Sequence, residues 1–491
     1  MRLSKSRFLS GLQCHKRLFL EVHASELATK ADAMRQAMLD MGNEIGAAAR
    51  LFFPGGVLVE EDYRHSTAAL QRTAELLADP EVSAIFEGAF QFDGTLVRVD
   101  VLERVDVMKW KLIEVKAASR VKSVHVDDLS VQAYVLQGNG LELAGTYLMH
   151  VNRHYCFVGG DLDYQQLFAL QDMTEGVEER LPRVAGHLRQ MKEVLSASSP
   201  PMVEPDSHCH SPYSCSFWDY CTREKSPRWI FHLPGEKKVF RQLKSMGIEL
   251  MDDIPSNHPL SVLQRHVKEN VEWISPTLGE VLRAVDYPVH HLDFETFMPA
   301  IPLYANTRPY QPLPIQWSNH IETEEGQLRH EEFLCRDQKD PREEIATRLL
   351  ASVGDKGSIC VYSEYERFVL LSLADVLPHL RQQLHQVVSR LWDLLSVVQH
   401  HYYHPQFRGS FSIKSVLPSL VPSLGYQDLE IQDGSSASST YHRVVFRETD
   451  WVERERLAQA LLQYCQRDTL AMVEIRRVLK SKASTPSGRP S

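Results

Sequence analysis

The sequence has little cysteine and no long apolar run, and each shortage excludes a class of protein. Eight cysteines in 491 residues are too few for a small scaffold stapled by disulfides. No segment reaches the roughly 18 apolar residues that a membrane-spanning helix needs, so we expect no membrane partner. The basic N-terminus lacks a long apolar core and a small-residue cleavage site, so no signal peptide is expected. We therefore expect a cytoplasmic protein, in a reducing compartment where clustered cysteines more often bind metal.

Positive charge is also in short supply. The net charge of -10 argues, on its face, against a nucleic-acid partner, although acids used in metal sites weaken that argument. The first 22 residues are an exception, because they contain five basic residues and only one acid, Glu21. The hydrophobic content of 43% and charged content of 24% are typical of a soluble globular protein. At roughly 100–200 residues per domain, the length predicts about two to four domains.

Hydrophobic periodicity predicts a first α/β unit in the N-terminal half. Spaced apolar residues predict helices at 31–52 and 127–138, and a longer helical stretch at 163–197. Residues 94–105 and 110–116 alternate between apolar and polar, and the turn-like sequence between them predicts a hairpin.

A second α/β unit is predicted after a helical connector at 226–285. Apolar strands are expected in DYPVHHLDFETF, PIQWSNHIE and SICVYSEY, and helical patterns cover 364–400 and 451–480. A strand-rich start and a helical end are typical of a three-layer α/β domain. The Ser- and Pro-rich tail at 481–491 is expected to be disordered.

Three charged residues fall on the predicted hairpin. Asp100 lies in its first strand, and Glu114 and Lys116 share one face of its second strand because they are two positions apart. Two carboxylates can hold a hard cation such as Mg²⁺ or Mn²⁺, which activates water and stabilises charge on a phosphate. Lys116 could position that water. The alternative is a solvated strand face with ordinary ion pairs.

Four cysteines are set apart from the rest by their surroundings. Cys209, Cys215 and Cys221 are separated by five residues each, which is wider than the spacing of a zinc ribbon, and Cys14 stands alone near the N-terminus. The other four lie in apolar patterns and are expected to be small core residues: Cys156, Cys335, Cys360 and Cys465.

A third group of polar residues lies in the second unit. Asp293 and Glu295 share a strand face, and Tyr464 and Asp468 share a helix face because they are four positions apart. The intervening sequence offers two further acids, Glu366 and Asp393. The alternative is a buried strand that ends in a helix-capping Thr.

The first two groups together resemble a nuclease family. RVDVLERV, LIEVK and a helix with VQAYVL are similar to the PD-(D/E)XK nucleases of the RecB-like branch. The resemblance implies that Gln132 and Tyr134 act with the catalytic strands, and that an upstream helix supplies Glu44 as a further metal ligand. Cys14 and the later trio bracket these motifs, as in the CRISPR-associated RecB-like exonucleases and the AddB-type helicase-nucleases. There, four cysteines bind a mainly structural [4Fe–4S] cluster. Zinc, with His208 or His210 as a ligand, and unliganded thiols remain alternatives.

The third group resembles the DEDD exonucleases of the DnaQ-like, RNase H-fold type, in their tyrosine-bearing form. The resemblance implies two metal ions about 3.5–4 Å apart, held by Asp293, Glu295 and Asp468, with Tyr464 aligning the attacking water. The family has three acidic motifs along the chain, and Glu366 stands where the second is expected. Asp393 is the alternative candidate for that metal ligand. Nearby aromatic residues are interleaved with basic ones, which suits single-stranded nucleic acid and ordinary packing almost equally: Arg308, Arg408 and Lys414.

From RLSKSRFLSGLQC to YCQRDTLAMV, the chain resembles a bacterial family that joins these two nuclease domains. The expected division is a RecB-like domain at 1–225, a connector at 226–285, a DnaQ-like domain at 286–480 and the tail. We expect a metal-dependent nuclease that acts on DNA at single-stranded ends, with two nuclease sites. The alternatives are an RNA-processing exonuclease and a catalytically decayed scaffold that binds nucleic-acid ends. The sequence identifies no protein partner.

Overall fold

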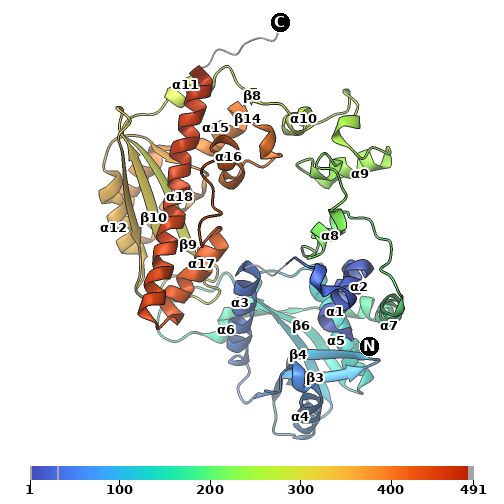
Figure 1. Cartoon of the computed structure of the whole chain (residues 1–491). Coiled ribbons are helices and arrows are strands. Elements are labelled where there is room, and N and C mark those ends of the chain that lie inside the picture. Colours follow the sequence, from blue (N-terminus) through green and yellow to red (C-terminus); the bar gives the residue numbers. More distant parts are fainter. Residues whose placement is uncertain (1–2, 30–32, 485–491) are drawn as a thin grey trace. The chain divides into compact units, whose positions relative to one another are not determined.

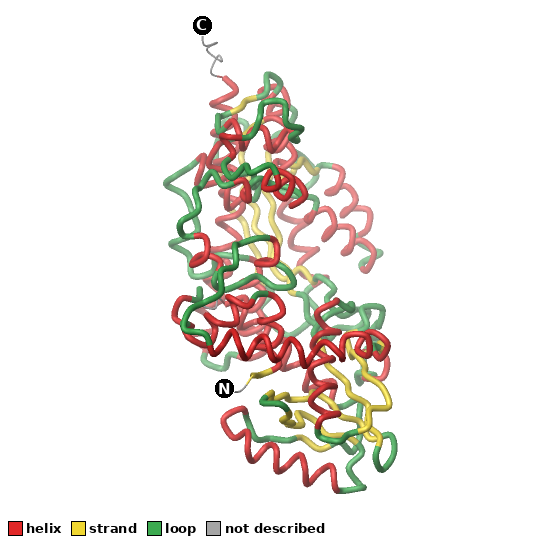
Figure 2. The backbone as a smooth tube through the Cα atoms, turned by 90° about the vertical axis from the view of Figure 1, so that its right-hand side faces the viewer, coloured by secondary structure: helices red, strands yellow, loops and turns green. Residues whose placement is uncertain are grey.

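The computed structural model describes residues 3–29 and 33–484. The chain divides into two compact units (Figure 1). Unit 1 comprises Met1–Lys225 and Pro299–Tyr310, and unit 2 comprises Ser226–Met298 and Gln311–Ser491. Both are mixed α/β, which confirms the fold class at that level, and in each the strands lie against helices (Figure 2). Within the described ranges, every helix is too short or too polar to cross a lipid bilayer.

Unit 1 is built on one mixed sheet in the order β2-β3-β4-β5-β6-β7, with β1 paired to β4. The strands are β1 (Leu3–Ser4), β2 (Val57–Leu58), β3 (Ala84–Phe92), β4 (Thr95–Arg104), β5 (Lys109–Lys116), β6 (Glu142–Val151) and β7 (Phe168–Asp172). Strands β3, β4 and β5 form an antiparallel meander that contains the predicted hairpin. The chain then crosses through a helix so that β6 runs parallel to β5.

The helices of unit 1 are α1 (Lys5–Gln13), α2 (His15–His23), α3 (Ala33–Arg50), α4 (Ser66–Ala78), α5 (Ser123–Gly138), α6 (Tyr164–Leu167), α7 (Thr174–Ser196) and α8 (Trp218–Thr222). Helices pack on both faces of the sheet, among them α5 on one face and α3 on the other. On one face, Leu112 of β5 packs in a cluster with Leu129 of α5. On the other face, Ile113 packs with Ile45 of α3, and Ala300 from the segment Pro299–Tyr310 joins the same cluster. Neighbouring residues of β5 therefore serve opposite cores.

The long helix predicted at 163–197 is interrupted in the structure. Helix α6 ends at Leu167, β7 follows, and α7 begins only at Thr174. The interruption forms because β7 pairs antiparallel with β6 and so satisfies backbone groups at the edge of the sheet. Periodicity alone carries no information about that distant partner.

Unit 2 is built on a five-stranded sheet in the order β11-β10-β9-β12-β13. Its strands are β9 (Val289–Phe297), β10 (Leu313–Glu322), β11 (Leu328–Leu334), β12 (Ile359–Val361) and β13 (Leu391–Asp393). Strand β10 runs antiparallel to both of its neighbours, whereas β9, β12 and β13 are parallel. A separate pair joins β8 (Trp273–Ile274) to β14 (Tyr402–Tyr403). Strand β13 divides the helical pattern predicted at 364–400, because it pairs with β12.

The helices of unit 2 are α9 (Lys237–Ser245), α10 (Val262–Glu269), α11 (Leu278–Arg283), α12 (Arg342–Val353), α13 (Tyr365–Val376), α14 (Arg381–Ser389), α15 (Leu394–His401), α16 (Ile413–Leu420), α17 (Gly434–His442) and α18 (Trp451–Ser484). Some of them pack on the sheet, with α12 on one side and α18 on the other (Figure 1). The side chains of Leu292 and Phe294 pack in one cluster with α12, α13 and α14. The alternate residues of β9 face α18, where Asp293 meets Cys465.

The ends of the predicted domains differ in detail. The segment 226–285, predicted as a connector, belongs to unit 2. Helix α18 continues to Ser484, so the first residues of the tail that was expected to be disordered are helical. The remainder of that tail, 485–491, lies outside the described residues.

Candidate functional site

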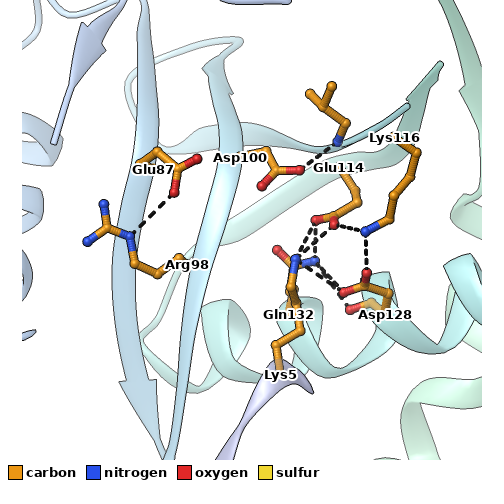
Figure 3. Close-up of polar contacts among 9 residues, drawn as sticks. Lys5, Glu87, Arg98, Asp100, Glu114, Lys116, Asp128 and Gln132 are labelled. Carbon is orange, nitrogen blue, oxygen red and sulfur yellow. Dashed lines mark hydrogen bonds and ion pairs between the residues drawn. The ribbon is translucent and has the colours of Figure 1, made fainter. Parts of the chain in front are cut away.

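In unit 1, the hairpin and the crossover helix bring most of the predicted residues together (Figure 3). Lys116 pairs with Glu114 on the same strand and with Asp128 Oδ2 at 2.8 Å. Gln132 Nε2 of α5 donates to Glu114 Oε2 at 2.7 Å. Asp100 Oδ2 accepts the backbone N–H of Val115 at 2.7 Å, which orients its carboxylate on the adjacent strand.

Two members of this group were not anticipated from the sequence. Asp128 precedes Gln132 by one helical turn and faces the same side of α5, where Gln132 Nε2 also donates to Asp128 Oδ1 at 3.1 Å. Lys5, the first residue of α1, places its Nζ 2.8 and 2.9 Å from the two carboxylate oxygens of Glu114. The helical spacing could have revealed Asp128, but no local signal pointed to Lys5.

The pKa values of the three acids in this group shift in different directions. Burial would raise the pKa of Glu114, but the ammonium groups of Lys116 and Lys5 hold that pKa well below its ordinary value. Burial and the neighbouring Glu114 raise the pKa of Asp100 to about 7. Burial and the same neighbour also raise the pKa of Asp128. Three acids and two lysines thus share one largely buried space.

Two predicted residues are not brought into this group. Tyr134 is two positions from Gln132, so the helix turns it to another side, where its hydroxyl donates to Asp93 Oδ2 at 3.3 Å. Glu44 is exposed on α3, and among the described residues no hydrogen bond or ion pair links it to Asp100 or Glu114.

The four separated cysteines line one cavity in unit 1: Cys14, Cys209, Cys215 and Cys221. Burial raises the pKa of Cys209 to about 11, with the thiols of Cys215, Cys14 and Cys221 adding to the rise. No three of these sulfurs lie within 4.8 Å of one another in the part of the chain that the structure describes. Tetrahedral zinc, with Zn–S of about 2.3 Å, would draw its sulfurs to about 3.8 Å apart. His208 Nε2 lies 3.6 Å from Cys209 Sγ, beside the same cavity.

The remaining cysteines do not behave alike. Cys335 and Cys360 are buried, as expected of core residues, but Cys156 is exposed, and the expectation was wrong there. Cys156 lies in the loop after β6, outside any regular element. Cys465 is buried, but it faces acids as well as apolar side chains.

In unit 2, three ligand atoms of Asp293, Glu295 and Cys465 lie within 4.8 Å of one another, so this group could hold a metal ion. Asp293 and Glu295 alternate along β9 and both face α18, which carries Cys465 and Asp468. Cys465 Sγ lies 3.6 Å from Asp293 Oδ2. Glu366, from the first turn of α13, raises the pKa of Asp293 and of Glu295 through its charge, which places it beside them.

The carboxyl groups of unit 2 perturb one another strongly. Burial and the charge of Asp468 raise the pKa of Glu295 to about 8, and they raise the pKa of Asp293 well above its ordinary value. Burial raises the pKa of Glu366 to about 7 and that of Asp468 to about 6. Glu295, Glu366 and Asp468 are each less than a tenth exposed. Buried carboxyl groups at this density need protons or cations.

Two tyrosines and one lysine complete this site. Tyr426 donates its hydroxyl to Asp468 Oδ1, and Tyr464 also hydrogen-bonds Asp468. Lys414 Nζ lies 5.1 Å from the centre of the Tyr464 ring, and its charge lowers the pKa of Glu295 and Asp468. Tyr426 was not expected from the sequence, because it lies in a loop without a motif.

Glu366 and Asp393 occupy different positions. Glu366 is buried and accepts the Ser363 hydroxyl at 3.2 Å. Asp393 caps α15, where its Oδ1 accepts the backbone N–H of Leu395 at 2.9 Å. A capping carboxylate already has a structural role, so Glu366 is the better placed of the two to act as a ligand.

The other two basic residues singled out in the sequence lie elsewhere. Arg308 belongs to the segment of unit 1 that joins β9 and β10. Arg408 adopts a left-handed backbone conformation after a short turn in unit 2.

Comparison with known proteins adds one relationship. Residues 290–412 match a protein family described as a domain of unknown function (DUF2779). The match includes Asp293, Glu295, Glu366 and Asp393, and it ends before α18. None of the curated proteins matches the chain.

Proposed function

We propose that this protein is a metal-dependent nuclease that hydrolyses phosphodiester bonds of DNA, with one site in each unit. The observation that carries the proposal is the set of buried acids in unit 2. Burial raises the pKa of each, and the charges of neighbouring carboxylates add to the rise for Asp293, Glu295 and Glu366. Such a group is stabilised when cations replace protons. Carboxylate oxygens are the ligands that Mg²⁺ and Mn²⁺ prefer.

The fold of unit 2 supports the comparison with DnaQ-like exonucleases. Its sheet order, with only the second strand reversed, is the arrangement expected of an RNase H-like fold. The acids come from the first strand, from a helix after the fourth strand, and from the last helix. We therefore propose an RNase H-like exonuclease domain.

In this site, the chain's own residues have distinct tasks. Asp293, Glu295, Glu366 and Asp468 would hold divalent ions, which lower the pKa of an attacking water and stabilise the leaving oxygen. Tyr426 fixes the orientation of Asp468 through its hydroxyl. The Tyr464 hydroxyl, which donates its proton to Asp468, would accept a hydrogen bond from the attacking water and so align it. Lys414 supplies positive charge for a phosphate.

The meander, crossover helix and parallel β6 of unit 1 support a PD-(D/E)XK nuclease domain. Asp100 and Glu114 would hold the metal there, and Lys116 would orient water. Asp128 fixes Lys116 and Gln132, which in turn hold Glu114. The same proposal assigns no catalytic task to Tyr134.

We propose that the four cysteines of unit 1 hold a [4Fe–4S] cluster. The donor set fits, because four thiols line one cavity and four cysteine thiolates are the ligands that such a cluster uses. When bound, the group would cross-link Cys14 to the segment 209–221.

The test is cleavage of end-labelled single-stranded DNA, with a matched RNA, by anaerobically purified protein in Mn²⁺. Asp468→Asn and Lys116→Met each remove one site without a change of shape, and exposed Asp355→Asn is the control. We expect each site variant to lose a different set of products and EDTA to abolish all cleavage. Absence of cleavage of both polymers by the unmodified protein would overturn the proposal in favour of a binding scaffold. Preferential cleavage of the RNA would show that RNA, rather than DNA, is the substrate.

A further inference from the structure

Lys5 reaches the acidic group of unit 1 from a separate segment of the chain (Figure 3). The short strand β1 pairs parallel with β4, so the N-terminal segment lies beside the strand that carries Asp100. Ser4 then caps α1 by accepting the backbone N–H of Arg7 at 3.3 Å. This arrangement sets Lys5 at the first position of the helix, with its side chain directed at the acids.

The contacts of Lys5 are those of a bound cation. Its Nζ lies 2.8 and 2.9 Å from the two oxygens of Glu114 and 3.4 Å from Asp128 Oδ1. Lys116 and Gln132 also donate to Glu114, so three side chains occupy its two oxygens. A carboxylate in that state has no oxygen left for a metal ion until one donor withdraws.

Lys5 is better placed than Lys116 to withdraw. Both ammonium groups face Asp128, but Lys116 Nζ lies 2.8 Å from Asp128 Oδ2, whereas Lys5 Nζ lies 3.4 Å from Asp128 Oδ1. Lys5 also covers both oxygens of Glu114, whereas Lys116 contacts one. The side chains of Lys5 and Lys116 are about equally exposed, at 22% and 26%, and each ammonium has a flexible stem that can turn toward solvent. The shorter contact of Lys116 with Asp128 therefore decides which of the two withdraws. Gln132 is neutral, and its departure would relieve no charge repulsion.

The helix that carries Lys5 is held at its other end by a segment far away in the sequence. Gln13 Nε2 donates to the carbonyl oxygens of His208 and Tyr213, each at 2.7 Å. The displacement of Lys5 is therefore a side-chain movement, and the ammonium stays tethered near the acids.

We propose that Lys5 is a tethered counter-ion that takes the place of a divalent cation between Glu114 and Asp128, and that it competes with the metal. This inference rests on the proposed metal site of unit 1. Lys5 is a positioning residue that keeps the acids ordered without metal and sets the metal concentration at which unit 1 is loaded. Removal of its charge should tighten metal binding, because a cation beside the site repels the incoming ion.

The experiment measures Mn²⁺ binding by the full chain, from the electron paramagnetic resonance signal of free Mn²⁺. Unit 2 is silenced by Asp293→Asn together with Asp468→Asn, so that binding reports on unit 1. Lys5→Met removes the charge, Lys5→Gln keeps a hydrogen-bond donor, and Lys5→Arg keeps the charge. Lys109→Met is the matched control, because Lys109 pairs with Glu142 at the other end of β5.

We expect the Kd for Mn²⁺ to fall by about tenfold or more in both Lys5→Met and Lys5→Gln. Lys5→Arg and Lys109→Met should bind as the parent does. A purely structural lysine would lower the melting temperature without tightening Mn²⁺ binding, so an unchanged or higher Kd in both uncharged variants overturns the inference. Absence of Mn²⁺ binding in the parent and in every Lys5 variant overturns the unit 1 metal site itself. Binding that Glu114→Gln abolishes supports that site.

Discussion

Cys465 Sγ lies 3.6 Å from Asp293 Oδ2, so a thiol sits directly against the carboxylates of unit 2. Burial and the charge of Asp293 raise the pKa of Cys465 well above its ordinary value, which keeps the thiol protonated at neutral pH. A protonated thiol is a poor ligand for hard Mg²⁺, but a soft ion such as Cd²⁺ can displace its proton.

Cys465→Ser should therefore leave Mg²⁺-dependent cleavage nearly intact and weaken inhibition by Cd²⁺. We expect the inhibitory Cd²⁺ concentration to rise by about tenfold, since a soft ligand is lost. The measurement is cleavage at fixed Mg²⁺ over a Cd²⁺ titration, with buried Cys335→Ser as the control. Loss of Mg²⁺-dependent cleavage in Cys465→Ser would contradict the assignment of the thiol as a bystander.

Glu366 and Asp393 can be separated by paired amide substitutions. Glu366→Gln removes a buried charge beside Asp293 and should reduce unit 2 cleavage by about 100-fold or more, as expected for loss of a metal ligand. Asp393→Asn should stay near the parental rate, because Asn also caps a helix. Initial rates and melting temperatures of both variants check the prediction. The reverse order of the two rates would make Asp393 the ligand.

The metal-free protein should lose stability as pH rises. Folding raises the pKa of Glu295 from 4.5 to about 8, that of Glu366 from 4.5 to about 7, and that of Asp468 from 3.8 to about 6. A carboxyl that holds its proton more tightly when folded adds stability below its unfolded pKa and loses that stability as pH rises through its folded pKa.

As pH rises from about 4 to about 8 in EDTA, the deprotonation of these acids should therefore lower the melting temperature of the protein. Added Mn²⁺ should raise the melting temperature more at pH 8 than at pH 5. The triple variant Glu295→Gln, Glu366→Gln and Asp468→Asn should show a flatter profile and little response to Mn²⁺. An equal pH response of parent and variant in EDTA would show that these acids do not couple protonation to folding.

Tyr426 should matter through Asp468 rather than through the substrate. Tyr426→Phe removes the hydroxyl that orients Asp468, and we expect metal affinity at unit 2 to fall by about 10- to 100-fold. Cleavage at saturating Mn²⁺ should recover. Tyr464→Phe, which removes the proposed water-aligning hydroxyl, should not recover at any metal concentration. Equal behaviour of the two variants would refute the division of tasks.

The cavity lined by four cysteines predicts the metal content of the purified protein. Anaerobically purified protein should contain iron and acid-labile sulfide in equal amounts, and Cys14→Ser should lower both together with the melting temperature. Cys156→Ser is the matched control, because that cysteine is exposed. One zinc per chain without iron would replace the cluster by a single-ion site.

The spacing of residues in the sequence predicted their arrangement correctly where the residues lie in one helix or in one hairpin. The alternation around Asp100 and Glu114 predicted two paired strands, and the four-residue interval predicted that Tyr464 and Asp468 share a helix face. Both depend only on the geometry of a strand or a helix. Tyr134 was expected beside Gln132, but two positions on a helix do not face the same way, and its hydroxyl lies against Asp93.

Relationships between distant segments could not be read from the sequence. Lys5 is 109 positions from Glu114, and Cys465 is 172 positions from Asp293. Their pairing depends on the register between strands and helices, which no single segment encodes. Cys465 was expected to be a core residue for that reason. It is buried, but the acids beside it could not be foreseen from the apolar pattern around it.

The segment Pro299–Tyr310 limits how this protein can be divided into fragments and how its two units can be exchanged in evolution. It belongs to unit 1, yet it lies within the connection between β9 and β10, the strands that open the unit 2 sheet. A gene fragment that stops after residue 225 therefore omits Ala300 from the unit 1 core. Neither unit can be exchanged by a single recombination event, so the two should be inherited together as one evolutionary module.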